Sequence, residues 1–213
     1  MIRVRAEDIR EGGVCGLLTA PLDPIADKVS IKAGLVMAHG AGGNARAAFL
    51  ERLATALAAY GIEVLRIDLP FRQKHPGPPR PNDAVADREG IREAIAWMRN
   101  RQPRVFAGGH SYGGRQASML AAEDPTVADL LLFTSYPLHP PGKPESLRTD
   151  HWPQIQTPAF FVQGTKDPFG SIEEIERALP LIPARHELYA AQGQGHSLAK
   201  LEFIEAFIKF ASI

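Results

Sequence analysis

Three side chains of the kinds used in nucleophilic catalysis, Ser111, Asp167 and His196, each follow a short apolar segment. A serine hydroxyl is a weak nucleophile at neutral pH, so an imidazole must take its proton during attack and later return it to the leaving group. A carboxylate is then needed to hold the imidazole in the correct tautomer and to stabilise the imidazolium. If the fold brings these three side chains together, they could transfer an acyl group.

Ser111 lies at the centre of the segment Gly109-His-Ser-Tyr-Gly113, which follows an apolar run that starts at Val105. This pattern is typical of a nucleophile elbow, a sharp turn from a strand into a helix that exposes the serine in a strained backbone conformation. Glycine is needed at both ends of the pentapeptide because a side chain there would collide with the neighbouring strand or helix. The alternative interpretation is a glycine-rich turn that serves packing alone, so the rest of the chain must decide.

The elements that would position these side chains alternate between strands and helices. Helical spacing and capping residues predict helices after Asn44, from Asp83, after Ser111 to about Glu123, from a capping box at Ser171, and after Ser197. Strands are expected at residues 2–7, 14–20, 34–38, 62–67, from 105, 128–134, 158–163 and 184–190, with proline-rich loops at 68–82 and 135–157. The first two strands would form an antiparallel hairpin, and the other six, joined largely by helices, a mostly parallel sheet. We predict one α/β domain over residues 1–213, with an eight-stranded sheet flanked by helices.

The predicted sheet brings the three side chains to one edge. Functional residues of an open parallel α/β sheet gather at the carboxyl ends of the strands. Ser111 follows the fifth predicted strand, Asp167 the seventh and His196 the eighth. We therefore predict a catalytic triad in which Ser111 is the nucleophile, His196 the general base and Asp167 the residue that orients it.

Backbone amides that could stabilise an oxyanion flank the same edge. The tetrahedral intermediate of acyl transfer carries a negative oxygen, which enzymes bind with preorganised N–H donors. The amide of Tyr112, next to the nucleophile, is one such donor, and the loop His39-Gly-Ala-Gly-Gly43 after the third strand supplies the other. We assign the second donor to Ala41, with Gly42 as the less favoured neighbour.

The segments Gly109-His-Ser-Tyr-Gly113 and His39-Gly-Ala-Gly-Gly43, with Asp167 and His196 at these places in the strand order, resemble the α/β-hydrolase superfamily over essentially the full chain. Its small dienelactone-hydrolase-like branch is more narrowly similar to Ser135-Tyr-Pro-Leu-His-Pro-Pro-Gly-Lys-Pro144, Gln163-Gly-Thr-Lys-Asp-Pro-Phe-Gly170 and Gly195-His-Ser197. That branch also includes a histone-acetyltransferase-complex subunit of the nonspecific-lethal type. The resemblance implies a carboxylic-ester-type hydrolase and no particular substrate. Dienelactone hydrolases proper use a cysteine nucleophile where this chain has serine, which argues against transferring their substrate.

Charged residues border the predicted site. Asp68 and Arg72 follow the fourth strand and Arg148 lies in the loop after the sixth. We expect a substrate-binding role for one of these three, although most such residues form surface or structural ion pairs. His39 and His110 are interpreted as structural residues that shape the loop and the elbow. The remaining histidines show no spacing typical of a metal site, so neither a metal nor a cofactor is expected.

The amino-acid composition limits the kinds of partner that the protein is expected to bind. The 24 basic and 24 acidic residues cancel, which removes the electrostatic footprint of a protein that binds nucleic acid or an anionic membrane. The single cysteine, Cys15, cannot form an internal disulfide, and no apolar stretch approaches the length of a membrane span or a signal peptide. We therefore expect a cytoplasmic protein whose partner is a small molecule, and the sequence does not predict its oligomeric state.

Together these patterns predict a serine hydrolase that cleaves a carboxylic ester or thioester of a small soluble substrate through an acyl-enzyme intermediate. Residues 135–157 are too few to fold as a cap domain, so the site should be open. Two other classes of function stay in view. One is a non-catalytic α/β-hydrolase-like interaction module. The other is a dinucleotide-binding protein, because Gly40-Ala-Gly-Gly-Asn-Ala45 fits the pattern G-x-G-x-x-[GA] between a strand and a helix, with Asp68 at the ribose.

Overall fold

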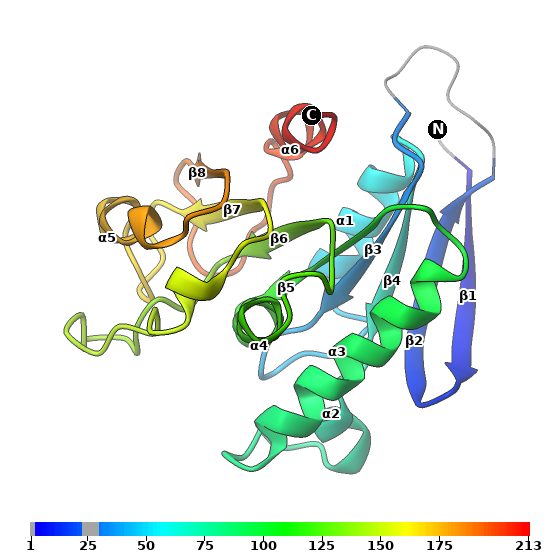
Figure 1. Ribbon diagram of the computed structural model, residues 1–213, viewed down its shortest axis with the longest axis horizontal. Coiled ribbons are helices and arrows are strands. Elements are labelled where there is room, and N and C mark those ends of the chain that lie inside the picture. Colours follow the sequence, from blue (N-terminus) through cyan, green and yellow to red (C-terminus); the bar gives the residue numbers. More distant parts are fainter. Residues whose placement is uncertain (1–2, 23–29) are drawn as a thin grey trace.

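A computed structural model describes residues 3–22 and 30–213 of the chain. Its eight strands form one sheet in the order β1-β2-β4-β3-β5-β6-β7-β8 (Figure 1). The strands are β1 (Val4–Glu11), β2 (Val14–Pro21), β3 (Ala33–Ala38), β4 (Ile62–Ile67), β5 (Val105–His110), β6 (Leu130–Thr134), β7 (Ala159–Gly164) and β8 (His186–Ala191). The pairings of β1 with β2 and of β2 with β4 are antiparallel, and the pairings from β4 through β3 to β8 are parallel. The predicted mostly parallel, eight-stranded α/β sheet is confirmed.

Helices cover both faces of the sheet (Figure 1). They are α1 (Ala48–Ala58), α2 (Pro70–Lys74), α3 (Asp83–Arg99), α4 (Tyr112–Glu123), α5 (Ile172–Ala178) and α6 (Ile204–Ala211). Side chains of α3, α4 and α5 pack into one core cluster, and those of α1 and α6 pack into a second cluster. Because successive strand residues point to opposite faces, Val36 of β3 contributes to the first cluster and Leu35 to the second. A strand buried on both faces explains the unbroken apolar run of β3.

The predicted helix starts agree with the structure at some places and are wrong at others. The capping box before α5 is confirmed, since Ser171 Oγ accepts the N–H of Glu174 at 3.2 Å and the Glu174 carboxylate accepts the N–H of Ser171 at 2.8 Å. Asn44 does not cap α1, which begins after Ala47; its side chain instead accepts the N–H of Arg46 in the preceding turn. Ser197 does not cap the last helix either, because α6 begins only after Phe203.

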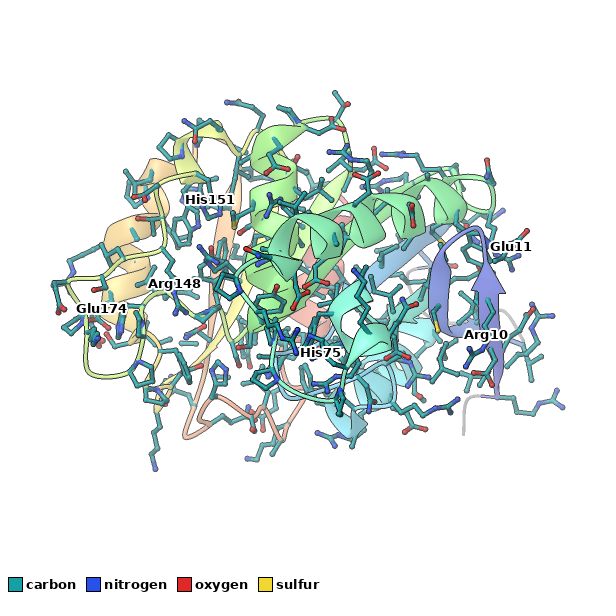
Figure 2. All side chains as sticks on the ribbon, turned by 90° about the horizontal axis from the view of Figure 1, so that it is seen from below. Arg10, Glu11, His75, Arg148, His151 and Glu174 are labelled. Atoms are coloured by element: carbon teal, nitrogen blue, oxygen red, sulfur yellow. The ribbon has the colours of Figure 1, made fainter. Side chains whose placement is uncertain are left out.

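The two proline-rich segments differ in structure. Residues 68–82, predicted to be a loop, contain the short helix α2, which starts with Pro70 at its first position, where a missing N–H costs nothing. Residues 135–158 link β6 to β7 with one short 3-10 turn at Trp152–Gln154, so no cap domain is inserted there. Figure 2 shows Arg148 and His151 on this second segment. The carboxyl ends of β3, β5 and β7 are therefore not covered by an inserted domain.

The β1–β2 hairpin is confirmed, with β1 longer at its end than expected: it runs to Glu11 and pairs there with Val14. The predicted start of this strand at residue 2 lies outside the described residues. None of the helices in the described ranges combines the length and the apolar character that crossing a membrane requires.

Candidate active site

Ser111 occupies the sharp turn between β5 and α4. Its backbone has φ 51° and ψ −116°, a region that costs a non-glycine residue free energy and that persists only where the surrounding structure enforces it. Hydrogen bonds on both sides enforce it here: the Ser111 N–H donates to Thr134 O at 2.9 Å, and the Ser111 carbonyl accepts the N–H of Arg115 at 3.0 Å. Ser111 is therefore held rigidly at the end of the strand.

Two glycines allow the turn to close. A Cβ atom at position 109 would lie 2.5 Å from backbone atoms of Gly113 and Gly114, and one at position 113 would lie 2.6 Å from the backbone of Ala38. Real Cβ contacts do not come this close, and backbone atoms cannot move aside as a flexible side chain can. The geometry thus requires glycine at both ends of the pentapeptide, as its pattern predicts.

Ser111, His196 and Asp167 are joined by hydrogen bonds. His196 Nε2 lies 2.8 Å from Ser111 Oγ, and His196 Nδ1 lies 2.9 Å from Asp167 Oδ2 and 3.0 Å from Oδ1. The Asp167 side chain is fully buried, and the His196 side chain is 23% exposed. A carboxylate only accepts, so the proton of the neutral imidazole sits on Nδ1 and Nε2 is left to accept the serine proton. The structure therefore brings together the three side chains that the sequence selected.

Aromatic rings fix the imidazole of His196. Phe169 packs on one side with ring centroids 4.3 Å apart, and His110 lies on another with centroids 5.4 Å apart. The His110 ring also packs against Phe49 and has its Nδ1 atom 3.3 Å from Thr134 Oγ1. Burial, and to a lesser extent the charge of His196, lowers the pKa of His110 to about 3, so His110 is neutral at physiological pH. His110 has the structural role expected for it, whereas the packing of Phe169 on His196 was not predicted.

The loop after β3 is held from outside by Arg72. The guanidinium donates from Nε to Gly43 O at 2.8 Å and from Nη2 to Ala41 O at 2.9 Å. Asp68 contributes as well, since its Oδ1 atom accepts the N–H of Ala45 at 2.7 Å. Asp68 and Arg72 are two of the three residues for which the sequence suggests a substrate-binding role. The structure places both against the backbone of this loop, and neither lines the cavity beside Ser111 described below.

His39 fixes the same loop from inside. Its Nε2 atom accepts the N–H of Leu69 at 3.2 Å, and its Nδ1 atom donates to Gly40 O at 2.8 Å. The side chain is buried, and burial lowers the pKa of His39. Gly40 O also accepts the N–H of Gly43 at 2.9 Å. His39 is thus a structural residue of this loop, in line with its interpretation from the sequence.

These contacts orient the peptide that contains the Ala41 N–H. In a trans peptide the N–H points opposite to the preceding carbonyl, and the described chain has no cis bond. Gly40 O points into the loop toward His39, so the Ala41 N–H points out of it. Tyr112 is the first residue of α4, and the first N–H groups of a helix have no acceptor within the helix. Ala41 and Tyr112 line the same cavity as Ser111, and each has an N–H that the loop or helix itself does not use.

The Tyr112 side chain turns to a buried carboxylate on α3. Its hydroxyl donates to Asp87 Oδ2 at 2.7 Å, and Asp87 Oδ1 accepts the N–H of Phe71 at 2.9 Å. Burial raises the pKa of the Asp87 carboxyl, and burial together with the Asp87 hydrogen bond and charge raises the pKa of the Tyr112 phenol. The pair links α2, α3 and α4 behind the elbow and fixes the Tyr112 side chain, which lines a cavity beside Ser111.

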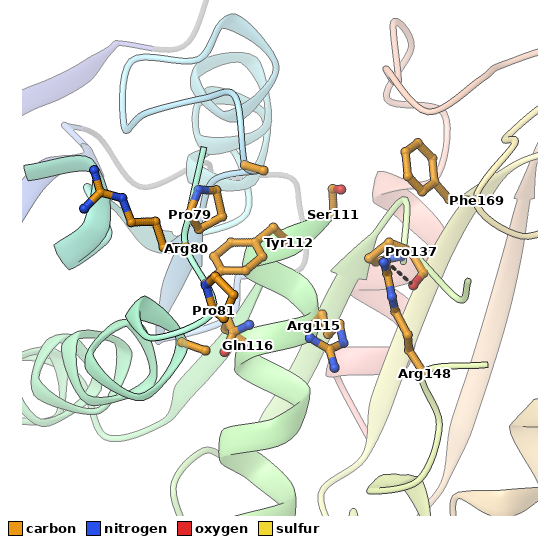
Figure 3. Close-up of a pocket in the computed structure, with 12 residues that line it drawn as sticks. Pro79, Arg80, Pro81, Ser111, Tyr112, Arg115, Gln116, Pro137, Arg148 and Phe169 are labelled. Carbon is orange, nitrogen blue, oxygen red and sulfur yellow. Dashed lines mark hydrogen bonds between the residues drawn. The ribbon is translucent and has the colours of Figure 1, made fainter. Parts of the chain in front are cut away.

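Two cavities adjoin Ser111. The first, about 540 Å³, is lined by both proline-rich segments and by α4, with Arg115 and Arg148 in its wall (Figure 3). The second, about 370 Å³, is lined by the loop after β3, by Phe49 and Leu50 of α1, and by His196. Ala41, Ser111 and Phe169 line both cavities and so separate them. In residues 3–22 and 30–213, no group of three His, Cys, Asp or Glu side chains is placed to hold a metal ion.

Of the predicted substrate-binding residues, only Arg148 reaches the first cavity; its Nη1 atom donates to Pro137 O at 3.3 Å (Figure 3). Arg115 and Phe169 also line this cavity and were not selected from the sequence. A signal for Arg115 was present in the sequence, because it lies one helical turn after Ser111 and must face the same end of the sheet. Phe169 carried no comparable signal, since its position depends on the path of the loop after β7.

An open, mostly parallel sheet with a serine at a strand-to-helix turn, followed by an aspartate and a histidine after later strands, is the arrangement of α/β hydrolases. The family model described as "Alpha/beta hydrolase domain" matches residues 31–205, and the chain belongs to this family. The superfamily resemblance carried by the sequence motifs is confirmed. The chain is accordingly a member of a hydrolase family.

Solved structures share the fold over nearly the whole chain. The protein TT1662 from Thermus thermophilus has a TM-score of 0.75 at 22% identity, covering 99% of this chain and 97% of that one. A dienelactone hydrolase from Anabaena variabilis has a TM-score of 0.69 at 21% identity, covering 99% and 95%. XC6422 from Xanthomonas campestris, described as a serine hydrolase without lid, has a TM-score of 0.63 at 19% identity, covering 92% and 85%. These similarities concern the fold, and they agree with a cap-less, dienelactone-hydrolase-like member of the superfamily.

Proposed function

We propose that the protein is a serine hydrolase that cleaves a carboxylic ester or thioester of a small soluble substrate through an acyl-enzyme intermediate. The observation that carries the proposal is the continuous chain of hydrogen bonds from Asp167 through His196 to Ser111, with the serine on a strained turn. A strained backbone with aligned donors and acceptors is costly to maintain and is found mainly where function needs it. Membership of a hydrolase family supports the same assignment.

Acylation would begin with attack of Ser111 Oγ on the carbonyl carbon, while His196 Nε2 takes the hydroxyl proton. Asp167 keeps the imidazole in the tautomer that can accept this proton and stabilises the imidazolium that results. The Tyr112 and Ala41 amides would bind the oxyanion, and His196 would pass its proton to the departing alcohol or thiol. The bond between the carbonyl carbon and the leaving oxygen or sulfur breaks, and an ester to Ser111 remains.

Deacylation would reverse these roles with water. His196 Nε2 takes a proton from the water as its oxygen attacks the acyl carbon, and the same donors bind the second oxyanion. The proton then returns to Ser111 Oγ as the acid leaves. The scheme uses only side chains and amides of this chain, so it needs no cofactor.

Covalent labelling by a fluorophosphonate probe tests the proposal directly. A probe of this class phosphonylates an activated serine, so we expect the wild-type protein to be labelled at one residue, Ser111. Ser111→Ala should abolish the labelling, whereas Ser197→Ala, which removes a serine beside the general base, should retain it. Absence of labelling in a folded wild-type protein would favour the interpretation as a non-catalytic interaction module.

The dinucleotide-binding alternative has less support. The loop 40–45 follows β3 rather than a first strand. Asp68, which would bind the ribose, instead accepts the Ala45 N–H. A thermal-shift measurement with NAD and NADP separates the two functions, because a dinucleotide site would raise the melting temperature with increasing cofactor concentration.

A further inference from the structure

The position of His196 indicates which cavity holds the leaving group of the substrate and which holds the acyl chain. This step depends on the proposed function: the imidazole must hand its proton to the leaving group, so that group has to lie on the side where His196 is accessible. His196 lines the second cavity, with Phe49 and Leu50, and is not part of the lining of the first. The second cavity therefore suits the alcohol or thiol, and the acyl chain has the first cavity to occupy.

The first cavity carries positive charge without a carboxylate to balance it. Its lining includes Arg80, Arg115 and Arg148, and no aspartate or glutamate among the described residues belongs to it. None of these three guanidinium groups forms an ion pair with a described carboxylate. Arg80 is exposed, and its side chain points away from Ser111 in Figure 3. The charge that faces the acyl chain is thus that of Arg115 and Arg148.

Arg115 and Arg148 lie close enough to repel each other. The two side chains are neighbours in Figure 3, and burial together with the charge of Arg115 lowers the pKa of Arg148. Arg115 Nε is buried and has no acceptor among the described residues. Two like charges in a partly dry site destabilise each other unless an anion lies between or beside them. A negative group between or beside the two guanidinium groups would relieve this repulsion and could accept from Arg115 Nε.

Arg148 is also held in place by a buried network. Tyr136 OH donates to the Arg148 carbonyl at 3.3 Å and accepts from Trp152 Nε1 at 3.1 Å. His151 Nε2 joins the same network at 2.8 Å from Ser118 Oγ on α4. Fixing the loop to α4 in this way keeps Arg148 beside Arg115.

We propose that the substrate carries an anionic group, such as a carboxylate, on its acyl side, and that Arg115 and Arg148 bind that group. The reaction would be hydrolysis of a half-ester of a dicarboxylic acid or of its thioester counterpart. Water adds to the acyl carbon, the bond to the alcohol oxygen or thiol sulfur breaks, and the products are a dicarboxylate, a neutral, largely apolar alcohol or thiol, and one proton released to solvent. A planar guanidinium matches a carboxylate through two parallel hydrogen bonds, which makes arginine suited to this task.

The test compares three benzyl esters with the same six-carbon acyl chain. Monobenzyl adipate carries its charge on the acyl side, benzyl hexanoate is neutral, and 4-carboxybenzyl hexanoate carries its charge on the alcohol side. We expect kcat/KM for monobenzyl adipate to exceed that for benzyl hexanoate by roughly tenfold or more, the size of effect that a charge-assisted bidentate contact gives. The 4-carboxybenzyl ester should be no better than the neutral ester. Equal rates for the three esters would overturn the inference.

Substitutions of the two arginines are compared through the ratio of kcat/KM for monobenzyl adipate to kcat/KM for benzyl hexanoate. This ratio does not depend on the fraction of the protein that is active. Arg115→Gln and Arg148→Gln should each lower the adipate-to-hexanoate ratio of kcat/KM by about tenfold, and Arg148→Lys should retain part of the preference because it keeps the charge but not the planar fork. The control is Arg177→Gln, an exposed arginine on α5, which should leave the ratio unchanged. A ratio that stays constant in both glutamine variants would exclude the assignment of the arginines.

A second readout needs no turnover and separates this inference from the proposed function. Free adipate should protect Ser111 from a fluorophosphonate probe at a concentration roughly tenfold lower than the uncharged hexanamide does, as expected for a charge-assisted contact. If Ser111 is labelled and adipate protects no better than hexanamide, the anion site is refuted while the serine hydrolase assignment stands. If the folded protein is not labelled at all, the proposed function fails, and the inference fails with it.

Discussion

The guanidinium of Arg72 donates to the carbonyl oxygen of Ala41 at 2.9 Å and so fixes the loop that lines a cavity together with Ser111. We therefore expect Arg72 to position this loop rather than to contact substrate. We expect Arg72→Met to lower kcat by roughly ten- to a hundredfold with little change in KM, because a misplaced oxyanion donor weakens binding of the transition state more than of the ground state. Steady-state kinetics with 4-nitrophenyl acetate measure the changes in kcat and in KM separately.

The conservative variant Arg72→Lys offers a graded control for that prediction. A lysine side chain can reach one of the two carbonyls that the guanidinium bridges, so the kcat of this variant should fall between those of the wild type and Arg72→Met. A fall in melting temperature without any change in kcat would instead assign Arg72 to stability alone.

Replacement of Asp167 by asparagine tests the orienting carboxylate. The amide nitrogen would donate to His196 Nδ1 and favour the tautomer whose Nε2 carries the proton, so the imidazole could no longer accept from Ser111. We expect kcat to fall on the order of 10³- to 10⁴-fold with the fold retained. Asp150→Asn, at an exposed position of the loop after β6, is the matched control and should keep wild-type kinetics. Comparable activity in the two variants would remove Asp167 from the mechanism.

The close backbone contact at Gly113 predicts a loss of stability. In Gly113→Ala the new methyl group would lie 2.6 Å from the backbone of Ala38 and His39, so the strand and helix must separate. We expect the free energy of unfolding to fall by more than about 2 kcal/mol, the usual cost of overpacking against atoms that cannot yield. Gly42→Ala is the comparison, because a Cβ there would meet no described atom within 4 Å. Urea titration measures the free energy of unfolding of both variants. A similar loss in Gly113→Ala and Gly42→Ala would contradict the steric explanation.

Buried neutral histidines predict that the fold is sensitive to acid. Burial lowers the pKa of His110 to about 3, and burial lowers that of His151 to about 4, whereas a histidine in the unfolded chain titrates near ~6.5. Below that pH the unfolded state takes up protons that the folded state does not. Each such histidine should therefore lower the free energy of unfolding by up to ~1.4 kcal/mol per pH unit as the pH falls from about 6.5 toward its folded value.

His110→Gln isolates this contribution. Removing the titrating ring should make the fall in the free energy of unfolding between about pH 6 and pH 4 less steep by about 1 kcal/mol per pH unit. Gln156→Asn, an exposed substitution that removes no titrating group, should leave the slope of the wild type in place. Equilibrium urea unfolding at several pH values provides the slopes, and parallel curves for wild type and His110→Gln would show that this histidine is not the cause.

The triad side chains could be located from sequence because their positions follow from strand order alone. Each comes directly after an apolar run, and the carboxyl ends of parallel strands meet at one edge whatever the details of the helices. The contacts of Arg72 and Asp68 were not predictable in the same way. Both lie just after β4, close to the site, and only the path of the neighbouring loop decides whether they face substrate or backbone.

The errors at helix ends have a related cause. Asn44 and Ser197 are residue types that favour caps, but α1 starts only after Ala47, and Ser197 is followed by a loop whose Leu198 is buried. Local propensity gives way there to packing between distant segments. At Pro70, by contrast, the sequence did contain a signal for the start of α2, because proline favours the first position of a helix. The many prolines that follow led to the prediction of a loop.

Ala41, Ser111 and Phe169 line both cavities, and the other lining residues of each cavity come largely from different parts of the chain. Residues 79–81, Pro137 and Arg148 line the first cavity, whereas the loop after β3 and helix α1 supply much of the lining of the second. Neither proline-rich segment supplies a member of the hydrogen-bonded triad. For the serine hydrolase proposed above, substitutions or length changes in these segments would alter which acids are accepted without moving Ser111, so selectivity for the acid and for the alcohol would be separately adjustable on one scaffold.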